Sequence, residues 1–377
     1  MQMPLYGLSR QYENLQEELN DMTHSIMKTG QCIDGIRTAS FEQIVARRCK
    51  RKYAISVNSA TQALIFAQMA LGIKNGTILI PGYTYVANLN SVLMADNTPV
   101  FADVDHNGLL DINSVQYNMS DRDVRAIVAV NLFGNMADYD KIKVVSQFCN
   151  PSKIIHIIED AAQSFGATYN KKPAGSFGEI SVLSFDPTKN LPNYGSGGML
   201  LMDDEGLANV CYDLRNNGMM DKNRRAGTNS RMSEIDCGHL IVKLKYFDAW
   251  QKRREEIADF YTEHLSPYVV PILPTKNVKS SWGRYVIQVS GTGGSSGYEM
   301  RNYLRTHLLK AGIPSKIPYE YPLFNAPCSP GISDKPNNTF KNSFRLCSET
   351  LCLPIYPELT DVEVETIATE IVEYFGG

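Results

Sequence analysis

Residues 154–203 read IIHIIEDAAQSFGATYNKKPAGSFGEISVLSFDPTKNLPNYGSGGMLLMD, and this stretch decides the fold. It contains three short apolar runs that are mostly continuous rather than alternating, which is typical of strands covered on both faces. Four similar runs come before it, with amphipathic stretches such as TQALIFAQMALG between several of them: YAISV at 53–57, ILIP at 78–81, PVFADV at 99–104 and AIVAVNL at 126–132. Strand and helix in alternation predict an α/β fold with a mainly parallel central sheet.

The sequence changes in character after residue 233. It predicts one long charged helix over 233–264, then two strands that include RYVIQV at 284–289, a helix over 300–312 and a last helix from Asp361. We therefore expect a large domain over 1–245 and a smaller α+β domain over 246–377. The Gly-rich loop at 290–297 lacks the Gly-Lys-Ser/Thr ending of a P-loop, so we do not expect it to bind phosphate.

Composition excludes several classes of protein. The 377 residues carry a net charge of -3, so no overall field recruits nucleic acid or an acidic membrane. The basic run RRCKRK at 47–52 is interpreted as cations that close a helix beginning near Ser40. The eight cysteines form no CxxC pair, the start has no secretory pattern, and no run reaches the roughly 18 apolar residues of a membrane span. We expect free thiols, a cytoplasmic location and, because no histidine lies in a metal motif, no bound metal.

Two polar residues follow neighbouring apolar runs. Asp160 ends IIHIIED, and Lys189 lies in SFDPTKN after the next run. Taken alone, Asp160 could be a cap and Lys189 a surface charge. Together, at the edge of a parallel sheet where ligands bind, they match pyridoxal 5'-phosphate (PLP) chemistry, which requires a lysine and often an acid beside the pyridine nitrogen.

Two further strand ends carry candidate cofactor residues. In VNSATQAL a strand runs into a helix through Ser59 and Thr61, and free N–H groups at a helix start can hold a phosphate. An ordinary helix cap explains the same residues. In PGYTYVANLNSV, Tyr83 or Tyr85 could stack on a pyridine ring, or both could pack in the core.

At this point the chain resembles the DegT/DnrJ/EryC1/StrS family of fold type I, PLP-dependent sugar aminotransferases. The resemblance runs nearly from end to end. It rests on GQCIDG with FEQIVARR, VNSATQAL, PGYTYVANLNSV, PVFADVD, VNLFGNMADYDKI, EDAAQSFGA, SFDPTKNLPNYGSGG, LRNNG, GTNSRMSEIDCGHL and LPIYPELTDVEVE, in the order of the family.

The resemblance implies a role for each matching residue. Lys189 is expected to carry PLP as a Schiff base, Asp160 to hold the ring nitrogen and Gln163 the ring hydroxyl. Tyr85 is expected to stack on the ring. The phosphate is expected to be held by Ser59, Ala60, Thr61 and Ser184, together with Asn229 of a neighbouring subunit, which implies a homodimer with shared active sites.

The chain departs from the family in three places. Ala60 replaces a glycine, which is tolerable if its backbone is not left-handed. Asn217 stands where a histidine is common in the family, and Phe324 follows Pro322 and Leu323 where the family has another histidine. These last two departures concern substrate identity. The residues expected to contact the substrate are Tyr319, Tyr321 and Phe324.

The resemblance implies transfer of an amino group from an amino acid, with glutamate as the expected donor, to a nucleotide-linked keto-sugar. Other family members have a histidine in place of the lysine and remove a sugar hydroxyl, and Lys189 favours transamination instead. Three alternatives stay open: a dehydratase, an aminocyclitol aminotransferase, and a PLP-binding regulator without turnover.

Overall fold

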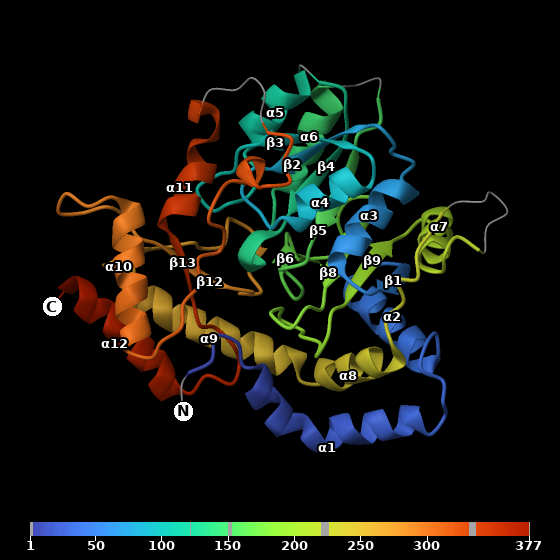
Figure 1. Cartoon of the computed structure of the whole chain (residues 1–377), viewed down its shortest axis with the longest axis horizontal. Coiled ribbons are helices and arrows are strands. Elements are labelled where there is room, and N and C mark those ends of the chain that lie inside the picture. Colours follow the sequence, from blue (N-terminus) through green and yellow to red (C-terminus); the bar gives the residue numbers. More distant parts are fainter. Residues whose placement is uncertain (1–2, 121, 150–152, 220–225, 332–336, 377) are drawn as a thin grey trace.

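The computed structural model describes residues 3–120, 122–149, 153–219, 226–331 and 337–376, and a seven-stranded sheet lies at its centre (Figure 1). The strand order is β1-β9-β8-β5-β4-β2-β3. The strands are β1 Tyr53–Val57, β2 Thr77–Pro81, β3 Thr98–Ala102, β4 Val124–Val130, β5 His156–Asp160, β8 Ile180–Ser184 and β9 Gly198–Met202. Each matches one of the apolar runs, so the predicted α/β fold with a mainly parallel sheet is confirmed.

All strands of this sheet except β9 run in the same direction. The carboxyl ends of β1, β5 and β8 therefore meet at one edge of the sheet. In open α/β sheets ligands bind outside this edge. The pairing thus brings together segments that the sequence separates by more than a hundred residues.

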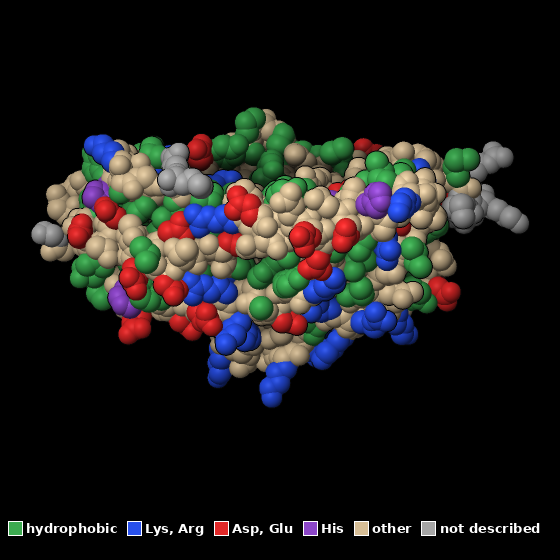
Figure 2. Space-filling view, turned by 90° about the horizontal axis from the view of Figure 1, so that it is seen from below, with side chains coloured by type: hydrophobic (Ala, Val, Ile, Leu, Met, Phe, Trp, Pro, Cys, Tyr) green, Lys and Arg blue, Asp and Glu red, His purple; other side chains and the backbone are tan. Residues whose placement is uncertain are grey.

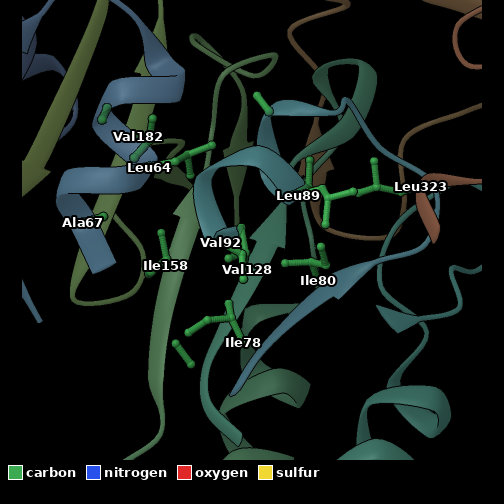
Figure 3. Close-up of a cluster of buried hydrophobic side chains, with 14 of the residues drawn as sticks. Leu64, Ala67, Ile78, Ile80, Leu89, Val92, Val128, Ile158, Val182 and Leu323 are labelled. Carbon is green, nitrogen blue, oxygen red and sulfur yellow. The ribbon is translucent and has the colours of Figure 1, made fainter. Parts of the chain in front are cut away.

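Helices cover both faces of the sheet because alternate strand residues point to opposite sides. Ile78 and Ile80 face α3 and α4, whereas Leu79 belongs to the core on the other face. Figure 3 shows Leu64 and Ala67 of α3 and Leu89 and Val92 of α4 close to the strand residues. The covering helices are α3 Ala60–Ala70, α4 Ala87–Met94 and α7 Glu205–Arg215 on one face, and α2 Ile36–Arg48, α5 Ile112–Ser120, α6 Tyr139–Cys149 and α8 Glu234–Leu244 on the other.

The single helix predicted over 233–264 is wrong. The structure has α8 and then α9 Phe247–Leu265, with a break at Lys245 and Tyr246. The N–H groups of these two residues donate to carbonyls only three positions back, which tightens and ends the helix. The break lets α8 pack on the large sheet while most of α9 packs in a second core, a requirement that the charged sequence does not reveal.

Helix α2 also begins earlier than predicted, at Ile36 rather than near Ser40. The carboxylate of Glu234, from α8, accepts hydrogen bonds from the backbone N–H groups of Gly35, Arg37 and Thr38 at 2.7–2.9 Å. This cap comes from almost 200 positions away, so the local sequence carries no start signal. The basic residues of the predicted helix end do occupy its last turn.

The C-terminal part forms a second layer around a small antiparallel sheet of β10, β12 and β13. Its elements are β10 Val270–Pro271, β12 Tyr285–Gln288, α10 Gly297–Lys310, α11 Lys341–Glu349, β13 Thr350–Leu353 and α12 Asp361–Gly376. Shorter elements are η1 Leu132–Gly134, β6 Thr168–Tyr169, β7 Lys172–Pro173, β11 Val278–Lys279, η2 Leu323–Asn325 and η3 Asn337–Phe340. Leu323 and Phe324 pack in the core of the large sheet, so the chain crosses back over the expected boundary, and the division at 245/246 stays a prediction.

The N-terminal helix α1, Leu8–Met27, lies along α8, where Leu15 and Leu19 contact Val242. The face that carries α1 and α9 mixes acidic and basic side chains, with Lys and Arg projecting along one edge (Figure 2). No described helix is long and apolar enough to cross a membrane. The eight cysteines are free thiols, and most are buried.

Candidate active site

One cavity of about 390 Å³ lies where the carboxyl ends of β5 and β8 meet the starts of α3 and α4. Residues of the C-terminal part close another side. Its wall contains predicted cofactor residues and one predicted substrate residue: Ser59, Ala60, Thr61, Tyr85, Asp160, Gln163, Ser184, Lys189 and Tyr319. The remaining lining residues are Leu64, Ala87, Asn88, Ala162, Asp186, Thr188, Ser196, Arg284, Lys316 and Pro318. The strand ends thus gather side chains that the sequence scatters over more than 250 positions.

Asp160 is buried at the end of β5, with 5% of its surface exposed. Its Oδ2 accepts a hydrogen bond from Asn88 at 2.9 Å, and its Oδ1 accepts one from the N–H of Ala162 at 3.0 Å. Burial raises the pKa of Asp160, although these bonds and the charge of Lys189 oppose the change. A cation in the cavity would offset the cost of this buried carboxylate, which suits a protonated ring nitrogen.

Lys189 lies in the loop after β8 and shares the cavity with Asp160. The loop is held by Asp186, whose carboxylate accepts from the N–H and the hydroxyl of Thr188 at 3.0 and 2.7 Å. Burial, with the nearby charge of Arg284, lowers the pKa of Lys189 to about 8, against the attraction of Asp160 and Asp186. An amine of this pKa is partly neutral near pH 7, as a nucleophile and proton carrier must be.

The start of α3, where the sequence predicts a phosphate cradle, lines the cavity. The Ser59 hydroxyl accepts from the N–H of Gln62 at 3.2 Å, so it caps the helix while lining the cavity. Ala60 is not among the residues with a left-handed backbone, which meets the condition for replacing the family's glycine. Strand β9 passes directly behind the cradle: a Cβ on Gly198 would lie 2.4 Å from the carbonyl carbon of Ser59. Glycine is required there for this close approach.

Gln163 and Tyr85 border the cavity differently. The Oε1 of Gln163 accepts from the N–H of Phe133 at 3.2 Å, and its Nε2 donates to the hydroxyl of Tyr319 at 3.0 Å. Tyr85 is 57% exposed, so its ring is free to meet a ligand, whereas Tyr83 is fully buried. Of the two tyrosines left open by the sequence, only Tyr85 reaches the cavity.

The remaining predicted residues do not reach this cavity within one chain. Phe324 is 3% exposed and packs against Phe101 and Phe340, so its ring is not available to a ligand. Tyr321 is 45% exposed and lies outside the lining. Asn229 is also exposed, and its Oδ1 accepts from Arg231 at 3.2 Å. Its role toward a neighbouring subunit stays a prediction.

The polar residues of the cavity wall that sequence reasoning missed include Asn88, Arg284 and Lys316. Asn88 had a weak signal, since it lies only three positions after Tyr85, in the first turn of α4. Arg284 and Lys316 come from the C-terminal part, and nothing in their local sequence indicates a contact with the strand ends.

The chain belongs to the DegT/DnrJ/EryC1/StrS aminotransferase family, whose sequence model matches residues 13–372. The pleiotropic regulatory protein of Geobacillus stearothermophilus is 30% identical over 379 residues, covering 100% of this chain and 99% of the relative. The dTDP-3-amino-3,4,6-trideoxy-alpha-D-glucose transaminase of Streptomyces venezuelae is 30% identical over 364 residues, covering 95% and 92%. The crystal structure of S. venezuelae DesV matches with a TM-score of 0.91 at 28% identity, over 99% and 98% of the two chains.

The cofactor of this family is PLP, and the cavity fits it. One end offers the hydroxyl groups and helix start of the cradle, and the other offers the buried carboxylate of Asp160. Asn88 adds a buried Oδ1 that has no hydrogen-bond partner among the described residues. Buried polar atoms are normally satisfied, so an unsatisfied one beside Asp160 indicates a bound polar group.

Proposed function

We propose that this protein transfers an amino group from an amino acid, with glutamate as the expected donor, to a nucleotide-linked keto-sugar. The observation that carries the proposal is that Lys189 and Asp160 line one cavity at the carboxyl ends of β5 and β8. The name of the S. venezuelae relative, a transaminase of a dTDP-linked amino sugar, supports the class of acceptor.

PLP, when bound, supplies a sink for the electrons that the donor's α-carbon releases as it loses its proton. Asp160 holds the proton on the ring nitrogen, and Asn88 and Ala162 keep its carboxylate oriented. Lys189 would attach the cofactor, and its Nζ, once free, would carry the proton from the donor's α-carbon to the cofactor. In the second half-reaction the same Nζ would carry the proton back as the amino group passes to the keto-sugar. Two separate half-reactions predict ping-pong kinetics.

The test is a half-reaction. Glutamate added to the PLP-loaded protein should change the visible spectrum and release one 2-oxoglutarate per active site. Lys189→Ala should bind PLP only noncovalently and do neither, because both attachment and the proton carrier are lost. Lys310→Ala, an exposed lysine at the end of α10, is the matched control. Normal turnover by Lys189→Ala would overturn the assignment.

We further propose a homodimer in which Asn229 completes the active site of the neighbouring subunit. Its exposed position outside its own cavity supports this arrangement. Mixing Lys189→Ala with Asn229→Ala subunits would place both lesions in one site and leave the other site intact. Part of the activity should return. If subunits exchange and no activity returns, or if the active species is a monomer, the shared site is refuted.

A regulatory role without turnover is the second candidate, because one relative is named a pleiotropic regulatory protein. The presence of both Lys189 and Asp160 favours turnover. The half-reaction separates the two: a regulator would bind PLP and leave glutamate unchanged. The cytoplasmic location stays a prediction of the sequence.

A further inference from the structure

Two cations of the active cavity have no part in the proton transfers described above. Arg284 and Lys316 both line the cavity together with Lys189. Neither side chain forms an ion pair with a described residue. No carboxylate is among the main groups that act on the pKa of Arg284. Within the described part of the chain, the guanidinium donates one hydrogen bond, from Nη1 to the hydroxyl of Tyr6 at 2.6 Å. A largely buried guanidinium normally has an anionic partner.

The backbone holds Arg284 firmly at the wall. Its N–H donates to the carbonyl of Phe133 at 3.1 Å, and the N–H of Phe133 donates to Gln163. The preceding Gly283 lies so close to Gln163 that a Cβ would be 2.4 Å from its carbonyl oxygen. Arg284 and Gln163 are therefore fixed relative to each other through one residue.

That linking residue is strained. Phe133 has φ 60° and ψ 9°, a left-handed conformation that an aromatic residue adopts only under constraint. Such strain is retained mainly where it positions functional groups. Here it turns the N–H of Phe133 toward Gln163 and its carbonyl toward Arg284, both of which line the cavity.

Both cations lie near Lys189, because each contributes to the lowered pKa of that amine. The charge of Arg284 lowers the pKa of Lys189 and acts on the pKa of Tyr319. The backbone of Lys316 forms a β-bridge with Cys352, which also acts on Tyr319. Arg284 and Lys316 thus add two positive charges to the part of the cavity that holds Lys189. A planar guanidinium with a nearby ammonium matches the geometry and charge of a carboxylate.

We propose that Arg284 and Lys316 form an anion subsite that binds a carboxylate group of the reacting substrate, separate from the cradle at the start of α3. The inference rests on the proposed aminotransferase function. A carboxylate could come from the amino-acid donor or from an acidic keto-sugar, and the same subsite would orient either beside Lys189.

The first experiment measures binding without catalysis. Glutarate, a dicarboxylate without an amino group, is titrated by calorimetry into the PLP-loaded wild type, Arg284→Gln, Lys316→Gln and Lys310→Gln. Glutarate should bind roughly 10- to 100-fold more weakly to Arg284→Gln and several-fold more weakly to Lys316→Gln, because charged hydrogen bonds are lost. Lys310→Gln should match the wild type. Glutaramide, of the same length but uncharged, should not distinguish the four proteins.

The second experiment separates the two sources of the carboxylate. If the donor supplies it, Arg284→Gln raises the glutamate concentration needed for the first half-reaction by the same factor and leaves the second half-reaction unchanged. If the acceptor supplies it, only the second half-reaction with a carboxylate-bearing keto-sugar weakens, and a neutral keto-sugar reacts as before. Arg284→Lys should restore part of the affinity, and it replaces Arg284→Gln if the latter loses PLP.

Unchanged glutarate binding together with unchanged half-reactions in both variants would overturn the subsite. Failure of the wild type to react with glutamate would instead count against the proposed function, while the glutarate titration would still decide the subsite. The two failures are therefore distinguishable.

Discussion

The most direct physical test concerns Lys243, a lysine with no exposed surface beneath the loop that carries Lys189. Its Nζ donates to the carbonyl of Pro192 at 2.7 Å and lies 3.7 Å from the centre of the Tyr194 ring. Burial lowers the pKa of Lys243 to about 7, although the carboxylate of Glu358 opposes the change. We predict that Lys243→Met stabilises the protein at pH 6 and not at pH 9.5.

The magnitude follows from proton linkage. An unfolded lysine holds its proton up to about pH 10.4, whereas the folded Lys243 releases it above about pH 7. Between these values the unfolded chain binds more protons, so the free energy of unfolding rises with pH, by at most about 1.4 kcal/mol per pH unit. Below pH 7, the burial of the protonated Lys243 therefore lowers the free energy of unfolding by an amount on the order of 4 kcal/mol. Methionine carries no charge and avoids this cost, but it loses a hydrogen bond worth about 1 kcal/mol.

The net gain of Lys243→Met at pH 6 should thus be on the order of 2–3 kcal/mol, falling to a small loss at pH 9.5, where the neutral amine keeps its bond to Pro192. Urea unfolding followed by tryptophan fluorescence at several pH values measures the difference. Lys310→Met, at an exposed site, should show no such dependence. A Lys243→Met effect that is constant with pH, or destabilising at pH 6, would refute the reasoning.

Three further predictions concern single contacts. Asp160→Asn should bind PLP but lower kcat/KM roughly 10- to 100-fold, because an amide cannot replace a charge-assisted bond and must turn an NH₂ group toward Asn88 or Ala162; near wild-type rates would make Asp160 a structural cap. Glu234→Ala should lower the free energy of unfolding by at least about 2 kcal/mol, since three N–H groups at the N-cap and first turn of α2 lose their acceptor, and Glu234→Gln, which keeps one oxygen, should lose about half as much. Gly198→Ala should weaken PLP retention by pushing β9 from the cradle, measured by equilibrium dialysis, whereas Gly206→Ala, in the first turn of α7, should retain PLP normally.

Some features of the site are local, and the sequence alone determined them. Continuous apolar runs become strands buried on both faces, and a polar residue directly after such a run must lie at the sheet edge. This placed Asp160 and Ser184 at neighbouring strand ends and Ser59 at the start of α3. The reason is that strand burial and helix caps depend on residues only a few positions apart.

Other features were decided only by the tertiary structure. The start of α2 depends on Glu234, the break between α8 and α9 on two separate cores, and the burial of Phe324 on aromatic rings from distant segments. The position of Arg284 in the same cavity as Lys189 depends on the strained turn at Phe133. The contacts of Glu234 with Gly35, of Phe324 with Phe101 and of Arg284 with Phe133 join residues about 150 to 225 positions apart. No short-range pattern encodes which distant side chain satisfies a backbone group or closes a cavity.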